Sequence, residues 1–173
     1  AWEYGWECNR EDLKANSAKI FDSYLKNGFT EAGFLKESVN YDKNFEDPVH
    51  SIRRQSEGLY AIFHFLAYEK EKGRKHPEWE QRLKNMLNMF LQLQNADGSF
   101  PRKFRDDFSI VDKSGGSTPS ATLPLVMGYK YFKDKRYLDS AKRTADYLEK
   151  ELISKADYFS STLDANCEDK EAS

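Results

Sequence analysis

The chain has 173 residues, of which 39% are hydrophobic, 32% charged and 14% aromatic, and its formal net charge is −2. This length is that of a single domain, and the small net charge gives no electrostatic reason to expect a nucleic-acid partner. The charge content alone would suggest disorder, but the aromatic content argues against it. Amphipathic helices with charged outer faces account for both figures. No apolar run approaches the roughly 18 residues that a membrane span needs.

The sequence gives little information about the compartment of the protein or its cofactors. No signal peptide is visible, but the chain begins with Ala1 rather than Met, so a cytoplasmic, periplasmic or secreted location stays open. The two cysteines lie at opposite ends and predict neither a disulfide framework nor a metal cluster. No metal-ligand set, nucleophile motif or phosphate loop is present. We therefore expect no metal and no cofactor, and the oligomeric state is not indicated.

The first residues are rich in aromatic side chains, with Trp2, Tyr4 and Trp6 around Gly5. Amphipathic rings at this density either cover a core or form a flat binding surface, and we favour packing. A helix is predicted over residues 11–26, closed by an Asn-Gly pair. Its inward side chains are expected to be Leu13, Ile20, Phe21, Tyr24 and Leu25.

Residues 29–49 read as a long irregular segment that ends in an Asp-Pro pair. A second helix is predicted over residues 50–72. Its middle, GLYAIFHFLAYEK, is apolar nearly all round, which predicts burial on every side. His64 lies within this stretch and is interpreted as a core histidine bonded to a neighbour rather than as a metal ligand.

The second half repeats this order. Pro77 fits the first position of a helix with a 3.6-residue apolar stripe, which ends at an Asp97-Gly98 turn. A long polar loop over residues 99–118 precedes an apolar helix with Pro119 at its first position. A further helix is predicted over residues 137–153, then a third loop, and then a helix start near Asp164.

Three stretches resemble one another. Residues 84–100, KNMLNMFLQLQNADGSF, align without a gap with residues 18–34 and, up to Leu148, with residues 141–159. A period of about sixty residues, each unit a helix pair, is typical of a stacked helical array. Connections from apolar inner helices to outer helices are short, and those from outer to inner helices are long. The long loops must then gather at one end, above the N-termini of the inner helices, where sites are commonly built.

The turn QNADGSF at 94–100 resembles the Q-x-x-DG-[GS]-[FW] turn of six-hairpin glycosidases and of terpenoid-cyclase-like toroids. The segment DANCEDKEA at 164–172 resembles an inner-helix start in bacterial glycosidase-like proteins of that superfamily. The resemblance covers about three quarters of the chain and implies an all-α fold, a partial (α/α) toroid of antiparallel hairpins. A full toroid needs about six or seven hairpins, so we expect residues 1–173 to form one helical domain that is an incomplete, excised or truncated part of a larger barrel.

The resemblance implies a carbohydrate-active protein with a glycan substrate, and glycoside hydrolysis needs two carboxyl groups about 5 Å or about 6.5–9.5 Å apart. Asp164, Glu168 and Asp169 form the best cluster of candidate catalytic acids, and Glu57, in the first turns of an inner helix, is the fourth. Ordinary helix capping explains the three clustered acids equally well. Glu57 could equally pair with Arg53 or Arg54.

Candidate substrate-binding residues surround these acids. Arg53, Arg54 and Arg102 could hold an acidic sugar or a phosphate, or could balance nearby acids on a solvated rim. Trp2 and Trp6 could stack on sugar rings if the N-terminus reaches the mouth, and Asp97 is a further candidate, although an Asp-Gly pair is turn chemistry by itself.

Rival functions remain, because fold does not determine function. One is a non-catalytic helical scaffold that binds a glycan or a protein. Another is a toroid of different chemistry, such as a sugar epimerase or a terpenoid cyclase. The polar long loops speak against a cyclase, and an epimerase would need paired histidines in the mouth, where only His50 is expected. Residues 1–173, as a partial barrel without the remaining hairpins, are not expected to be active.

Overall fold

The computed structural model describes residues 1–40, 42–43, 45–113 and 117–155. It is mostly helical, as predicted. The helices are α1 (Trp2–Glu7), α2 (Glu11–Asn27), α3 (Ile52–Glu71), α4 (Pro77–Leu93), α5 (Thr118–Phe132) and α6 (Lys135–Tyr147), which continues into a π-helical turn, η2 (Leu148–Ile153). The strands are β1 (Val39–Asn40), β2 (Phe45–Glu46), β3 (Val49–Ser51), β4 (Lys103–Arg105) and β5 (Ile110–Asp112).

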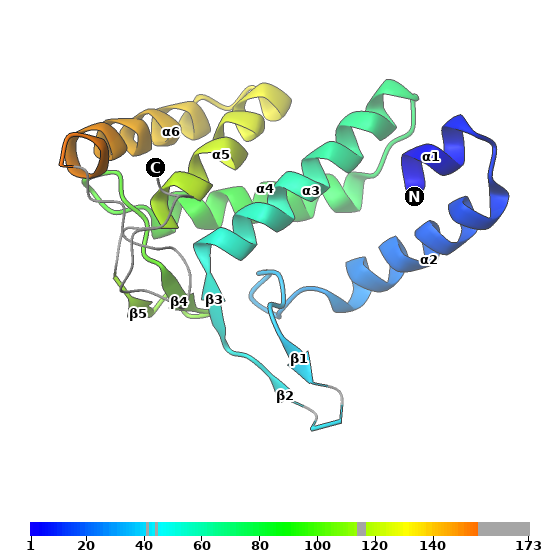
Figure 1. Cartoon of the computed structure of the whole chain (residues 1–173), viewed down its shortest axis with the longest axis horizontal. Coiled ribbons are helices and arrows are strands. Elements are labelled where there is room, and N and C mark those ends of the chain that lie inside the picture. The colour runs from blue at the N-terminus through cyan, green and yellow to red at the C-terminus, as the bar shows by residue number, and fades with distance from the viewer. Residues whose placement is uncertain (41, 44, 114–116, 156–173) are drawn as a thin grey trace.

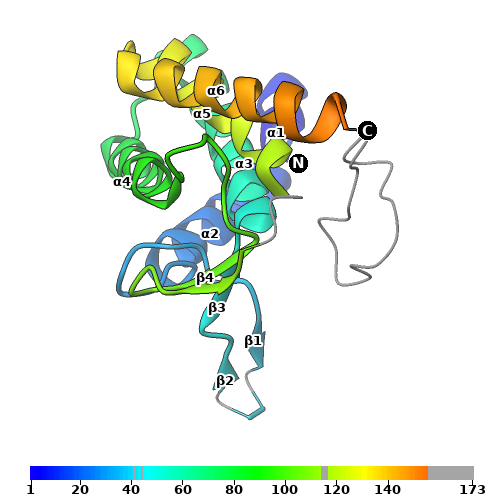
Figure 2. The same ribbon diagram turned by 90° about the vertical axis from the view of Figure 1, so that its left-hand side faces the viewer.

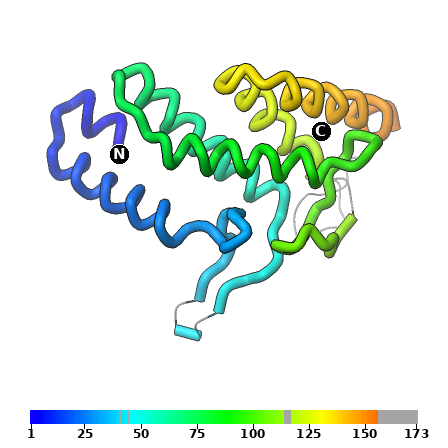
Figure 3. The backbone as a smooth tube through the Cα atoms, turned by 180° about the vertical axis from the view of Figure 1, so that it is seen from behind, coloured from blue at the N-terminus to red at the C-terminus, as the bar shows by residue number. Residues whose placement is uncertain are grey.

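The helices form the two layers that the connection lengths predict. Helices α3 and α5 pack against each other as the inner pair, and α5 packs on α6 (Figure 2). Seen from behind, α4 runs across the molecule between α2 and α6 (Figure 3). The long connections before α3 and α5 meet at one end of the molecule, where all the strands lie (Figure 1). Among the described residues no helix is long and apolar enough to cross a membrane.

The long connections are more ordered than the sequence suggested. Strands β3, β4 and β5 form an antiparallel sheet in which His50 pairs with Phe104, and β1 and β2 form a separate hairpin that projects from the same end (Figure 1). The prediction of an irregular segment before α3 was therefore wrong in part. Strands of two or three residues are too short to show an alternating pattern. The β3–β4 pairing ties the first long connection to the second.

A turn recurs after α2 and after α4, in keeping with the predicted repeat. The amide of Gly33 donates to the Thr30 carbonyl, and that of Gly98 to the Asn95 carbonyl, each over 3.0 Å. Both glycines have positive φ, 97° and 95°, a conformation that glycine adopts without strain. The turn is displaced by one residue relative to the gapless alignment of the two helices.

The core lies between the two helical layers and under the β3–β4–β5 sheet. Its largest fully buried side chains include Phe34, Phe63, Phe90, Phe100, Phe104 and Tyr137. The predicted stripe on α4 is buried as expected at Trp79, Leu83, Met86, Leu87 and Phe90.

Two packing predictions were wrong. Helix α3 is not buried on every side, because Glu57, Tyr60, Ala61 and His64 form an exposed stripe along it. His64 is on this stripe, and its ring makes an edge contact with Tyr60 at 4.3 Å between centroids. On α2, Ile20 and Tyr24 are 67% and 40% exposed rather than inward. The apolar composition of α3 and α2 predicted that both faces would be covered. Among the described residues, no helix or strand covers them.

Candidate functional site

A pocket of about 250 Å³ opens between the first turns of α3 and α5, at the end where the long connections meet. We call it the mouth pocket. Helix α3 contributes a charged pair, a serine and a tyrosine, and α5 contributes a serine and an apolar wall. The lining residues are Arg53, Ser56, Glu57 and Tyr60 of α3 and Ser120, Leu123 and Pro124 of α5.

The pocket contains one carboxylate among its described lining residues. Glu57 Oε1 accepts a hydrogen bond from Arg53 Nε over 3.1 Å, one helical turn away. The Glu57 side chain is 62% exposed, so the carboxylate is open to solvent and to a ligand. The pairing of Glu57 with Arg53 was one of the alternatives that the sequence left open.

Ser56 gives the pocket an unsatisfied polar atom. The residue is buried, and its Oγ has no hydrogen-bond partner among the described residues. Buried polar groups are nearly always hydrogen-bonded. The Oγ atom is itself buried, so it lies beneath the surface of the pocket rather than on it.

Ser51 caps the N-terminus of α3, and Glu37, a residue that the sequence did not single out, binds Ser51. Ser51 Oγ accepts from the Arg54 amide, and the carboxylate of Glu37 accepts from the Ser51 amide, from the Ser51 hydroxyl and from Gln55 Nε2. Arg54 lies 3.8 Å from the same carboxylate. Glu37 is in the first long connection, at no characteristic spacing from the helix.

His50, in β3, is fully buried and is not among the described residues that line the mouth pocket. Its Nε2 lies 2.8 Å from Asp106 Oδ1, which also accepts from Thr30 Oγ1 over 2.9 Å. The ring stacks on Phe34, with 5.1 Å between centroids. These contacts join the first long connection, β3 and the β4–β5 turn, so His50 helps to hold the two long connections together.

Other predicted site residues lie apart from the mouth pocket. Arg102 is buried beside the sheet and donates to Asp112 Oδ2 over 3.2 Å. Asp97 Oδ1 accepts from the amide and the hydroxyl of Ser99, at 3.0 and 2.7 Å, which is turn chemistry. Neither residue lines the pocket.

The aromatic N-terminus does not reach the mouth. Trp2 Nε1 donates to Glu69 Oε1 over 2.7 Å at the C-terminal end of α3, and its ring packs edge-on against Phe21 and Phe65. The Arg74 guanidinium lies 4.0 Å from the Trp6 ring centroid. The structure therefore separates Trp2 and Trp6 from Arg53 and Glu57.

The three remaining candidates, Asp164, Glu168 and Asp169, lie outside the described residues. Their role as catalytic acids stays a prediction. Within the described ranges, no group of three or more His, Cys, Asp or Glu side chains is arranged to hold a metal ion.

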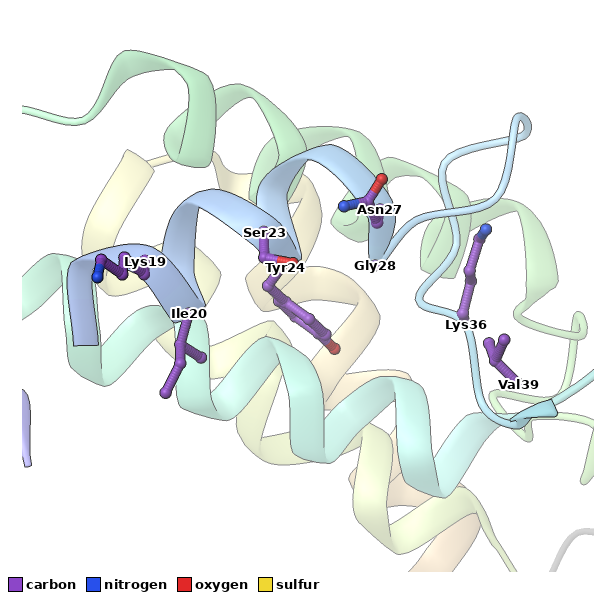
Figure 4. A pocket seen from close by; sticks show the side chains of 8 residues that line it. All are labelled: Lys19, Ile20, Ser23, Tyr24, Asn27, Gly28, Lys36 and Val39. Carbon is purple, nitrogen blue, oxygen red and sulfur yellow. The ribbon is translucent and has the colours of Figure 1, made fainter. Parts of the chain in front are cut away.

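A second cavity, of about 390 Å³, lies between α2 and the segment that leads to β1 (Figure 4). Its wall comes from α2 at Lys19, Ser23, Tyr24 and Asn27, and from Lys36 on the facing segment. None of the eight residues labelled in Figure 4 is acidic. Glu46, which lines an adjoining cavity, supplies a carboxylate that is paired with Lys36 over 2.8 Å. We therefore take the mouth pocket as the better candidate.

No family model matches the sequence. Solved structures do resemble it. The cellobiose 2-epimerase of Bacillus thermoamylovorans B4167 superposes with a TM-score of 0.66 at 19% identity, over 82% of this chain and 36% of that one. A sugar epimerase from a ruminal bacterium gives 0.65 at 17% identity, over 80% and 36%.

A third match is an unsaturated glucuronyl hydrolase with dGlcA-Glc-Rha-Glc, at a TM-score of 0.55 and 13% identity, over 80% of this chain and 39% of that one. The chain thus spans little more than a third of the length of these proteins. Over about 80% of its length, the chain has the α/α toroid fold that these proteins share.

Proposed function

We propose that this chain forms part of a carbohydrate-active toroid, in which the mouth pocket binds a sugar and Glu57 is one of its acid/base groups. The observation that carries the proposal is the composition of the pocket. A carboxylate open to solvent and an apolar wall at Leu123 and Pro124 converge at the N-terminal turns of two inner helices. The resemblance to sugar epimerases and to a glucuronyl hydrolase supports it.

Our first candidate reaction is glycoside hydrolysis. It needs a second carboxyl group opposite Glu57, because the described lining of the pocket contains no other acid. We assign that role to the segment containing Asp164, Glu168 and Asp169. In this scheme one carboxyl group protonates the leaving oxygen, and the other acts as the nucleophile or activates water.

The second candidate is sugar epimerisation, which the likeness to cellobiose 2-epimerases favours equally. Glu57 would then transfer a proton at a carbon next to a carbonyl group, without cleavage of a glycosidic bond. His50 is buried and bonded to Asp106, and His64 is on α3 outside the lining of the mouth pocket. The described residues therefore supply no histidine pair at this position.

One assay separates the candidates. The protein encoded by the whole gene is incubated with disaccharides, and the products are followed by NMR. A new reducing end indicates hydrolysis, a C2 epimer without cleavage indicates epimerisation, and binding without turnover indicates a scaffold. Glu57→Gln should lower kcat by about 10²–10⁴-fold in either enzyme. Glu71→Gln, an exposed acid at the far end of the same helix, is the matched control. Wild-type turnover by Glu57→Gln would refute the role of Glu57.

A further inference from the structure

We infer that the mouth pocket selects an uncharged sugar ring and discriminates against uronates and sugar phosphates. The inference rests on the proposed sugar-binding function and specifies its substrate class. It follows from three features of the mouth: the occupied N-terminus of α3, the pairing of its arginines, and the chemistry of the pocket wall.

The first feature is the anion already bound at α3. The N-terminus of a helix attracts anions, through its free amides and its dipole. Here the Glu37 carboxylate fills that position, because it accepts from the amide and the hydroxyl of Ser51. The Glu37 side chain is only 7% exposed. A ligand carboxylate or phosphate would meet a fixed negative charge at the place where it would otherwise bind.

The second feature is the absence of surplus positive charge. Arg53 is paired with Glu57 at 3.1 Å, and Arg54 lies 3.8 Å from Glu37. Each arginine that the sequence offered for an acidic sugar at α3 therefore has an acidic partner. The formal charges of the side chains in the described lining of the pocket, one positive and one negative, sum to zero. An arginine that is already paired attracts a further anion only weakly.

The third feature is the apolar part of the pocket lining, which comes from Leu123 on α5 and from Tyr60 on α3. Leu123 is 51% exposed and Tyr60 42% exposed, so both present apolar surface to the pocket. A pyranose has an apolar face and a rim of hydroxyl groups, and ligand pockets typically match apolar walls with a few placed polar groups. The Arg53–Glu57 pair supplies donors and an acceptor that suit neutral hydroxyl groups.

The test uses two ligands that differ only at C6, methyl β-glucoside and methyl β-glucuronide. Each is titrated into the isotopically labelled chain at low salt, and binding is followed by the NMR shifts of the Ser56, Glu57 and Ser120 amides. We expect the glucoside to bind at least fivefold more tightly than the glucuronide. A preference for the glucuronide would overturn the inference while leaving sugar binding intact, and would assign the carboxylate to the N-terminus of α5. Binding of neither ligand would overturn the proposed function and the inference with it.

Two variants test the electrostatic cause. Glu37→Gln removes the bound anion without altering the pocket lining, so glucuronide affinity should rise about fivefold while glucoside affinity stays within twofold. Glu57→Gln leaves Arg53 without its carboxylate partner at 3.1 Å and should shift the glucuronide-to-glucoside ratio in the same direction. Because Glu57 is exposed, this second variant keeps the test valid even if Glu37→Gln unfolds. An unchanged ratio in Glu57→Gln, with Glu71→Gln as control, would show that charge does not set the selectivity.

Discussion

Glu69 is the residue at which a conservative change should destabilise this protein most clearly. Its side chain is 1% exposed and accepts from Trp2 Nε1 at 2.7 Å, from Arg74 at 2.8 and 2.5 Å, and lies 2.6 Å from His76 Nε2. Burial alone would raise the pKa of Glu69, but the hydrogen bonds from Arg74, Trp2 and His76 outweigh it and lower the pKa from 4.5 to about 2. The carboxylate therefore holds α1 and the α3–α4 connection together as an anion.

The magnitude follows from this shift. The fall in the pKa of Glu69 from 4.5 to about 2 corresponds to about 3 kcal/mol of folding free energy. Because the folded-state pKa is the lower one, this stability is present above pH 4.5 and is lost as the pH falls toward 2. About half of it should remain at pH 3. Breaking a buried ion pair typically costs a similar amount, about 3–5 kcal/mol.

Urea unfolding of Glu69→Gln, monitored by circular dichroism, measures the effect. At pH 7 we expect the free energy of unfolding to fall by about 3 kcal/mol, and at pH 3 the difference from wild type should shrink by about half. Glu57→Gln, the same substitution at an exposed ion pair of the same helix, should cost less than about 0.5 kcal/mol. Equal losses for the two variants, or a gap for Glu69→Gln that does not change with pH, would refute the reasoning.

Two further predictions concern the hydrogen bonds of Asp106 and the repeated turn. Asp106→Ala removes the acceptor of both Thr30 Oγ1 and His50 Nε2 and should cost about 1–3 kcal/mol in urea unfolding, whereas Asp107→Ala, at the exposed neighbouring position, is the control. Gly98→Ala would place a Cβ 2.1 Å from the Arg143 carbonyl oxygen at a positive φ and should cost more than about 2 kcal/mol. Gly73→Ala, also at positive φ but with open space around it, should cost only about 1–2 kcal/mol, so equal costs at the two glycines would show that the contact with Arg143 is unimportant.

The helices and their layering could be predicted because their signals are local. The Asn-Gly pair after α2 and the prolines at the starts of α4 and α5 mark helix ends within a residue or two of those observed. The lengths of the connections then fix which helices lie at the inside. The short helix α1 was missed because six residues around a glycine give too little periodicity to recognise.

The candidate site was predictable only in part. Arg53 and Glu57 are four positions apart on one helix, so their pairing follows from helical geometry. Ser120 and Leu123 could not be assigned to the same pocket, because their position depends on how α5 crosses α3. Glu37 was missed since its partner, Ser51, lies fourteen positions away in a loop of unknown path. The exposed stripe on α3 could not be predicted for a similar reason. The composition of a helix shows that it is apolar, but not which neighbouring elements cover it.

The pairing of β3 with β4 has a consequence for how such a site can change over time. The two long connections that lead to the helices lining the mouth are joined there by main-chain hydrogen bonds, which almost any side chain tolerates. Rim residues such as Ser120 or Leu123 can therefore be exchanged without displacing the framework that carries them. New binding specificities could arise on this scaffold by substitution alone, with no rebuilding of the backbone.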